Sequence, residues 1–502
     1  MGGWAAVWGG ACRLLALGLA AAAVAAGDRP AQAADREADE VEGDEAFLRP
    51  DIDPVLRTKI DAAIVRGVEH LRGKLQAKLE EVKDWHPSPA VRGARANLEQ
   101  HPVGHVALYA LTLIKCGDGP GNELVDRAMA WLRERHPRQE LFMGTYDVSV
   151  TLMALQAYLH HPASLRRTEE ERRADLEWAR KMAFWLMSGS NDGGWAYVCP
   201  GYIESGGEYP MPGPRQPRSA EEGREARARE RRARRERDRG GSGEAEVPDP
   251  AEVVRFRTPP DLPGFHAPPR GFGDRSNTQY AVLGLQAASR LGIAFPDRFW
   301  DRIALRCLDS QMGDGEEVDL LFTREWRYEL SGEERSARHA NGWGYGNFGP
   351  PVRSSGVSAS MTVAGLAILR VAQDHVTQAP VRKRIPVALE DGWAWLQRHF
   401  TVTANPCYNQ AEAPAVPVLD PSPANRPLTL YYLYGLERAG VFCQVRHVGG
   451  HDWYVEGAEH LCVSQLADGS WMARAEYHCM GLLFLKRASH GVVQEYEIGE
   501  MR

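Results

Sequence analysis

The sequence lacks several features that would assign it quickly to a class. Its 502 residues contain no Cys-x-x-Cys pair, and its eight scattered cysteines predict neither a zinc ribbon nor a disulfide framework. Beyond the N-terminus, no apolar run is long enough to span a membrane. Basic and acidic residues nearly balance, 60 against 67, and the net charge of −7 argues against a dedicated nucleic-acid binder. The remaining composition, 43% hydrophobic and 25% charged, is typical of a globular protein.

The N-terminus resembles a secretory signal peptide. Arg13 precedes an apolar core, Leu14–Ala26, and Ala31-Gln32-Ala33 fits a small-x-small cleavage site. The core of about 13 residues is shorter than the roughly 20 that a spanning helix needs. An Ala-rich buried helix is the structural alternative. We predict a signal peptide over residues 1–33, an exported protein that is periplasmic or extracellular, and no transmembrane span after cleavage.

Internal repetition is the most informative signal in the chain. In one pattern, a small residue precedes leucine within a segment that is apolar on most sides, which favours a helix packed on both faces. In a second pattern, a large residue precedes leucine near the end of an amphipathic segment, which favours a helix with one face in water. The first pattern occurs at Tyr109-Ala110-Leu111, Met153-Ala154-Leu155, Leu283-Gly284-Leu285, Ala364-Gly365-Leu366, Tyr434-Gly435-Leu436 and Met480-Gly481-Leu482. The second occurs at His70-Leu71, Trp131-Leu132, Trp185-Leu186, Cys307-Leu308, Trp395-Leu396 and His460-Leu461.

The strict alternation of the two patterns predicts six helix pairs. Six inner and six outer helices can close on themselves as an all-α (α/α)6 barrel, and closure leaves no terminal repeat uncovered. An open superhelix is the alternative. We assign the barrel to residues 55–490, after a polar segment at residues 34–54 and before a C-terminal tail at residues 491–502.

Irregular insertions interrupt the predicted repeats. The largest spans residues 203–263 and includes the Arg/Glu-rich run 221–239. Because its charges have both signs, a solvated or disordered segment is favoured over a contact with nucleic acid or an anionic surface. The other insertions are residues 313–340 and 401–427.

One stretch in the last pair carries a recognisable motif. Its residues are Gly457, His460-Leu461, Gln465, Gly469 and Trp471. This spacing resembles the QW motif of squalene and oxidosqualene cyclases. Weaker relatives are Gly194-Trp195, which lacks the glutamine, and Gln311, whose aromatic partner Trp343 follows an insertion.

A structural role for the motif follows from helix chemistry. A glutamine at the end of an outer helix can bond backbone groups left unpaired there, and a tryptophan after a glycine turn can cover that end. With the six phased pairs, the motif makes the chain resemble the terpenoid cyclase and protein prenyltransferase toroids, the prenyltransferase and squalene oxidase repeat proteins. The resemblance covers roughly residues 55–490 and implies the fold more than the reaction.

The catalytic motifs that this resemblance implies are absent. There is no Asp-x-Asp-Asp cluster to protonate an alkene, no Asp-x-Cys zinc motif, no Asp-Asp-x-x-Asp and no Cys-Gly-Glu-Gln thioester. His478-Cys479 is adjacent rather than suitably spaced. His451, Asp452 and Cys443 lie nearby in sequence and could complete a zinc site, but buried or hydrogen-bonded helix residues are the favoured interpretation. We predict no metal and no cofactor.

Candidate site residues stand at the predicted starts of inner helices. The catalytic candidates are Asp147, Asp274, Glu476 and His478, and helix capping is the competing interpretation for the carboxyls. The ligand-binding candidates form a polar-aromatic set, in which tyrosine faces suit cations, sugars or apolar ligands with a polar end. They are Tyr146, Asn277, Gln279, Tyr280, Tyr431, Tyr432 and Tyr477.

Three functions remain open. The first is an exported toroid that binds an isoprenoid, a glycan-like ligand or a protein partner without cyclase chemistry, which the missing acid cluster favours. The second is a divergent terpene cyclase or isomerase that uses a single Asp acid. The third is a polysaccharide lyase or hydrolase, which needs paired carboxyls or a Tyr/His acid–base pair.

Overall fold

The fold is that of a computed structural model, which describes most of the predicted repeat region. The predicted signal peptide, the insertion 203–263 and the tail 491–502 lie outside the described residues, as does the polar segment up to residue 50. The described residues are 51–85, 101–135, 144–190, 192–197, 273–296, 298–326, 329–346, 356–407, 426–472 and 474–489.

The described residues are mostly helical, and two kinds of α-helix alternate along them. Amphipathic helices expose one side, whereas the helices between them are buried along nearly their whole length. The amphipathic helices are α2 (Pro54–Glu81), α4 (Glu123–Arg133), α6 (Glu169–Ser188), α9 (Phe299–Asp309), α11 (Ala379–Arg398) and α13 (Trp453–Ser464). The buried helices are α3 (Pro102–Lys115), α5 (Gly144–His160), α8 (Arg275–Arg290), α10 (Ala359–Gln373), α12 (Arg426–Cys443) and α14 (Ala475–Leu485). A short 3-10 helix, η3 (Pro162–Arg166), follows α5. The predicted alternation of two helix types is thus confirmed in these residues.

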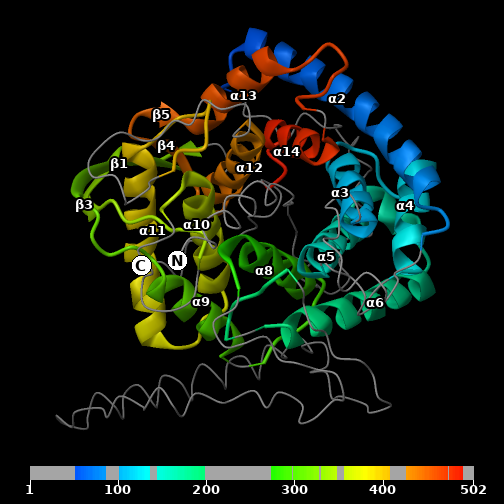
Figure 1. The fold of residues 1–502 in the computed structure, drawn as a ribbon, viewed down its shortest axis with the longest axis horizontal. Coiled ribbons are helices and arrows are strands. Elements are labelled where there is room, and N and C mark those ends of the chain that lie inside the picture. Colours follow the sequence, from blue (N-terminus) through cyan, green and yellow to red (C-terminus); the bar gives the residue numbers. More distant parts are fainter. Residues whose placement is uncertain are drawn as a thin grey trace, which may run out of the picture.

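Contacts among the buried helices follow the chain and then return to its start. Helix α3 contacts α5, α5 contacts α8, α8 contacts α10, α10 contacts α12, and α12 contacts α14. Helix α14 also contacts α3 and α2, and the amphipathic helix α13 contacts α2 (Figure 1). The first and last helix pairs therefore lie against each other.

A tryptophan closes the carboxyl end of three amphipathic helices. In each case the indole Nε1 donates to a main-chain carbonyl in the last turns of the helix. The bonds run from Trp195 to Leu186 at 2.8 Å, from Trp343 to Cys307 at 2.9 Å, and from Trp471 to Leu461 at 2.8 Å. The bond from Trp343 to α9 confirms the predicted aromatic partner beyond the insertion.

A glutamine beside two of these helix ends reaches the next amphipathic helix. Gln311 Nε2, after α9, donates to the carbonyl oxygen of Ala388 in α11 at 2.9 Å. Gln465 Nε2, after α13, donates to the carbonyl oxygen of Ala63 in α2 at 2.8 Å. The same bond therefore joins two consecutive amphipathic helices and also the last one to the first. The motif therefore has a structural role, but its glutamines bond carbonyls within the next amphipathic helix rather than unpaired groups at their own helix ends.

The turn before the tryptophan requires glycine at two sites. Gly193 and Gly469 each precede a motif tryptophan by two residues, and both have a φ of +82°. A Cβ atom at Gly469 would also lie 2.5 Å from the carbonyl oxygen of Arg66. An L side chain is disfavoured at such a φ, so glycine is the residue that permits this turn.

A small antiparallel sheet corrects the expectation of an all-α fold with irregular insertions. Strands β1 (Glu317–Trp326), β2 (Glu329–Leu330) and β3 (Glu334–His339) occupy most of the insertion 313–340. Strand β1 pairs with β2, β3 and β4 (Val445–Val448), and β4 pairs with β5 (His451–Asp452). The side chains of β3 alternate in exposure, which is the two-residue period of a half-buried strand. The helical period of the flanking segments concealed this signal.

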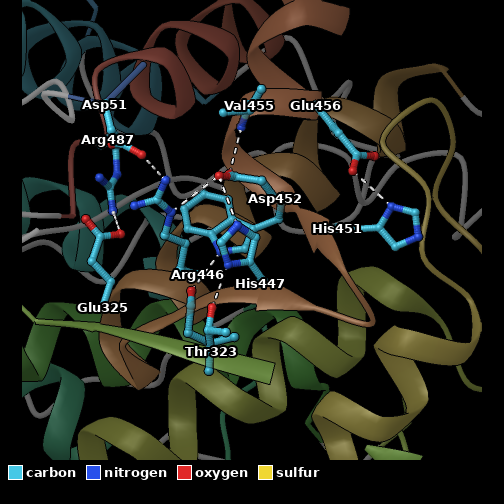
Figure 2. Close-up of polar contacts among 12 residues, drawn as sticks. Asp51, Thr323, Glu325, Arg446, His447, His451, Asp452, Val455, Glu456 and Arg487 are labelled. Atoms are coloured by element: carbon cyan, nitrogen blue, oxygen red, sulfur yellow. Dashed lines mark hydrogen bonds and ion pairs between the residues drawn. The ribbon is translucent and has the colours of Figure 1, made fainter. Parts of the chain in front are cut away.

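Side-chain bonds fix the sheet to the helices. Gln397 of α11 accepts from the Leu321 amide at 2.7 Å and donates to the Asp319 carbonyl at 2.9 Å. Behind the sheet, the buried ion pair of Arg487 and Glu325 joins the end of α14 to β1 at 3.3 Å (Figure 2). The sheet therefore packs against α11, α12 and α13 without replacing a repeat.

Packing of a motif tryptophan against a buried helix predicts opposite effects at two helical glycines. A Cβ at Gly365 of α10 would lie 2.5 Å from Trp343 Cδ2, so Gly365→Ala should lower the free energy of unfolding by about 1–3 kcal/mol. A Cβ at Gly73 of α2 meets nothing within 4 Å, so Gly73→Ala should raise it by about 0.5–1 kcal/mol. Urea unfolding measures both values. Equal effects of the two substitutions would contradict the packing.

Candidate functional site

The candidate site lies where the buried helices begin. Asp274 is the N-cap of α8 and accepts from the Asn277 amide at 2.8 Å. Ser358 caps α10 in the same way, and Asn405 Oδ1 accepts a further N–H, from Ser360, at 2.9 Å. Short polar side chains at helix starts satisfy main-chain donors that have no helical acceptor. The polar residues found there in the sequence are therefore partly explained by capping.

A hydrogen-bond chain joins the starts of three buried helices. Tyr146 Oη of α5 donates to Ser276 Oγ of α8 at 2.8 Å. Ser276 Oγ bonds Tyr431 Oη of α12 at 2.7 Å, and Tyr431 Oη donates to Gln279 Oε1 at 3.3 Å. These residues are buried, so the structure brings together four side chains from helices far apart in the sequence.

Further tyrosines surround this chain. The rings of Tyr146 and Tyr280 lie 5.1 Å apart, and those of Tyr146 and Tyr197 lie 5.9 Å apart. Tyr197 and Tyr345 are half-buried and bond each other through their hydroxyls at 3.0 Å. We call Tyr146, Tyr197, Tyr280, Tyr345 and Tyr431 the tyrosine cluster. Its half-buried members form its more accessible side.

One carboxyl and one guanidinium border the tyrosine cluster. Burial raises the pKa of Asp274 to about 6, and hydrogen bonds from Asn277 and Tyr345 limit the rise. The Arg438 guanidinium lies 5.4 Å from the ring centre of Tyr280 and 4.3 Å from that of Tyr434. A cation already occupies the faces of two tyrosines.

Two amide groups within the site have spare hydrogen-bonding capacity. Asn277 Oδ1 and Gln279 Nε2 are buried, and neither has a partner among the residues that the structure describes. One is an acceptor and the other a donor. A buried polar atom without a partner is unfavourable, so each atom favours a complementary polar group.

Asp147 caps a neighbouring helix. The N-cap residue of α3, His101, makes no side-chain capping bond, and the Gly104 amide in the first turn donates to the Asp147 carboxyl instead. A Cβ at Gly104 would lie 2.5 Å from Asp147 Oδ1, so glycine allows this approach. Burial raises the pKa of Asp147 to about 8. The carboxyl is therefore mostly protonated at neutral pH.

Glu476 forms a pair with a histidine that the sequence did not single out. Its Oε1 lies 2.7 Å from His105 Nε2, and both side chains are buried. Burial alone would raise the pKa of Glu476, but the hydrogen bond and charge of His105 dominate and lower it. Asp147 and Glu476 thus contact consecutive residues of α3, Gly104 and His105.

The remaining candidates lie apart from the tyrosine cluster. His478 Nε2 bonds the carbonyl oxygen of Gly67 in α2 at 2.8 Å, and its ring stacks on Trp471 at 5.3 Å. Burial lowers the pKa of His478 to about 4. The contacts of its ring are those of a residue that packs helices together. Tyr432 and Tyr477 are buried, and within the described ranges no hydrogen bond joins either to the cluster.

Two members of the tyrosine cluster were not predicted as site residues, although the sequence contained a signal for them. Tyr197 and Tyr345 each follow a motif tryptophan by two residues, in Trp195-Ala196-Tyr197 and Trp343-Gly344-Tyr345. The tryptophan fixes the turn at the end of an amphipathic helix, and the tyrosine two residues later meets the start of a buried helix. Arg438 and His105 had no comparable sequence signal.

The residues around β4 and β5 form a separate polar network (Figure 2). Asp452 is the N-cap of α13, accepting from Val455, and it lies 3.4 Å from Arg446 Nε and 3.5 Å from His447 Nε2. His447 Nδ1 in turn bonds Thr323 Oγ1 at 2.5 Å. Asp452 is thus engaged in joining the sheet to α13.

His451 and Cys443 do not join Asp452 in a metal-binding set. His451 pairs with Glu456 at 2.9 Å, and Cys443 is a buried free thiol. Among all the residues described, no three His, Cys, Asp or Glu side chains are grouped to hold a metal ion. The same residues include no helix with the length and apolarity needed to cross a bilayer.

Comparison with known proteins adds no relative. No family model, curated protein or solved structure matches the chain.

The burial of Asp147 predicts a pH-dependent stability. Since its pKa rises from an ordinary 3.8 to about 8, the folded chain holds a proton that the unfolded chain releases, and stability is lost as the pH rises through this window. Asp147→Asn keeps an oxygen for Gly104 and cannot ionise. Relative to the wild type, it should gain about 1 kcal/mol or more in unfolding free energy between pH of about 5 and 9.

The matched control is Asp319→Asn, which removes an exposed carboxyl paired with Arg335. Its unfolding free energy should follow the wild type across the same pH range. If the unfolding free energy of Asp147→Asn changes with pH in the same way as that of the wild type, the Asp147 carboxyl is not held protonated by burial.

Proposed function

We propose that the chain is an (α/α)6 toroid, related to the squalene cyclase and prenyltransferase repeat proteins, and that it is exported. The contacts that return from α14 to α3 and from α13 to α2 support the toroid. The Gln465 bond to α2 supports it further, because it repeats the bond that Gln311 makes to α11. The relationship to that family and the export rest on the motif and on the signal peptide predicted from the sequence.

The proposed function is the binding of a hydroxyl-rich, glycan-like ligand at the tyrosine cluster. The observation that carries it is the chain Tyr146–Ser276–Tyr431–Gln279, whose last member also has an unpartnered amide Nε2 among the described residues. Sugars present both hydroxyl donors and acceptors and an apolar face that stacks on aromatic rings. The cluster offers a partner for each of these features.

The charges of the site support a glycan over a carbocation. The guanidinium of Arg438 lies against Tyr280 and Tyr434, so its positive charge opposes a second cation at these ring faces. The carboxyl of Asp147 is occupied by the start of α3. Both features weigh against a cyclase that uses a single Asp acid.

Binding by purified chain to defined probes tests the proposal. We expect cellohexaose or chitohexaose to raise the melting temperature and to give a binding isotherm, and squalene to give neither. Tyr431→Phe removes the hydroxyl between Ser276 and Gln279 but keeps the ring, and should weaken oligosaccharide binding about fivefold. Binding of squalene alone would contradict the glycan-like ligand.

Tyr158→Phe is the matched control. It also removes a bonded hydroxyl, which donates to Asp126 at 2.7 Å near the far end of α5. Tyr158→Phe should lower the free energy of unfolding by about 1 kcal/mol, as Tyr431→Phe does. It should leave the affinity for the oligosaccharide unchanged. Equal losses of affinity in the two variants would trace the effect to stability.

Closure of the toroid is testable by distance measurement. Val65 on α2 and Val463 on α13 are exposed, so spin labels on Cys substitutions there should disturb little. Because packed helices lie about 8–10 Å apart, a closed ring predicts one narrow, short distance between the labels. A broad distribution of distances, or a long distance, in double electron–electron resonance would favour an open superhelix.

A further inference from the structure

Histidines lie where the last helix pair meets the first. Helix α14 contacts α2 and α3, and we call these contacts the seam (Figure 1). At the seam, the rings of His478 of α14 and His70 of α2 lie 5.0 Å apart. His105 Nε2 of α3 lies 2.7 Å from Glu476 Oε1 of α14. Side chains that can gain or lose a proton near neutral pH therefore stand on both sides of the seam.

The surroundings of His478 fit its neutral form. Its Nε2 lies 2.8 Å from the carbonyl oxygen of Gly67 in α2, and a carbonyl only accepts, so this nitrogen carries the ring proton. Its Nδ1 is buried and has no partner among the residues that the structure describes. A Cβ atom at Gly67 would lie 3.2 Å from His478 Cε1, so the two helices approach closely here. A second proton, on Nδ1, would bury a positive charge and a donor without an acceptor.

The basic groups of α2 oppose a positive charge on His478. The charges of His70 and Lys74 disfavour its protonation, whereas the carboxylate of Asp468 favours it. Asp468 is 59% exposed and lies 3.7 Å from His70 Nδ1. Because water screens an exposed carboxylate, Asp468 compensates a buried imidazolium only weakly. A protonated His478 is therefore repelled by the helix against which it packs.

The other titratable groups that contact α14 are engaged elsewhere. Glu476 lies two residues before His478, but it is already paired with His105 of α3. Helices α12 and α13 also pack on α14. Their titratable contacts lie at its far end and are those of Glu437 of α12 with Ser489 and of Tyr454 of α13 with Leu485.

We propose that the seam is sensitive to acid, and that protonation of His478 at Nδ1 separates the last helix pair from the first. In the separated state, water surrounds the imidazolium and supplies the acceptor that the closed seam lacks. When the pH rises, the neutral ring bonds Gly67 again, so the opening is reversible. This device does not depend on the ligand proposed for the tyrosine cluster.

The direction of the effect follows from burial. Burial lowers the pKa of His478 from an ordinary 6.5 to about 4, so the open seam binds the proton more tightly than the closed seam. The closed seam is therefore favoured above a pH of about 6.5 and weakens as the pH falls toward about 4. Between about pH 7 and 5, the ratio of open to closed molecules should rise about tenfold.

Labelling of cysteines in the purified full-length chain tests the opening. Cys479 of α14 is a buried free thiol that bonds Thr112 of α3, so separation of the seam exposes it. Cys307 of α9 is also a buried free thiol, but it contacts α8 and α10 instead. Dithiodipyridine labels thiols in acid, and mass spectrometry locates the label. The labelling rate of Cys479 relative to that of Cys307 should rise about tenfold between about pH 7 and 5.

Two matched variants identify the group that senses acid. His478→Gln keeps an N–H for the Gly67 carbonyl but takes no second proton, so it should abolish the rise. His399→Gln is the control and should keep it. Burial lowers the pKa of His399 to about 4 as well, but its ring lies 4.4 Å from that of Trp395 in α11, away from the seam.

Three outcomes would overturn the proposal. The first is a rise in His478→Gln as large as in the wild type. The second is faster labelling of Cys479 and Cys307 together, which would indicate global unfolding. The third is a constant labelling ratio of the two thiols in the wild type, a result that does not depend on any variant folding.

Discussion

The hydrogen bond from a tryptophan indole to the last carbonyls of an amphipathic helix determines how a helix pair is built. The ends of helices leave carbonyl groups without helical donors, and burying such a group without a partner costs about 1–3 kcal/mol. Trp343 and Trp471 each add a donor to a carbonyl in the last turns of a helix and place their rings against the following buried helix. The rings fit only because Gly365 and Gly481 carry no side chain. One interaction therefore fixes the helix end, the turn and the inner packing.

The candidate site forms where buried helices begin. Trp195 ends α6 before α8, one of the three helices that meet there. The starts of α5, α8 and α12 meet through Tyr146, Ser276 and Tyr431. Carboxyls at these starts satisfy main-chain donors, Asp274 on its own helix and Asp147 on α3. Capping explains why single acidic residues recur there without a second acid beside them.

The sequence predicted the features that depend on period and on helix-end chemistry. The alternating helices and the roles of Gln465 and Trp471 follow from local patterns, because each acts within a few residues of the helix it ends. Several ligand-binding candidates come together because each lies near the start of a buried helix; they are Tyr146, Gln279, Tyr280 and Tyr431. The local hairpin of β1 and β3 was missed because the helical period of the flanking segments concealed it, and the pairing of β1 with β4, about 120 residues later, has no local signal. Arg438 was missed because it stands late in α12, away from the helix start.

The two ends of the buried helices differ in their polar groups. The starts hold hydroxyls, amides and Asp147, whereas α3, α5 and α8 end on Lys115, His160 and Arg290. On α5, Tyr146 and His160 are fourteen residues apart, which is about 21 Å along the helix axis. Short polar side chains satisfy main-chain donors at a helix start, and the helix dipole favours a cation at a helix end. The same helix chemistry that builds the candidate site at one end therefore explains the charges at the other.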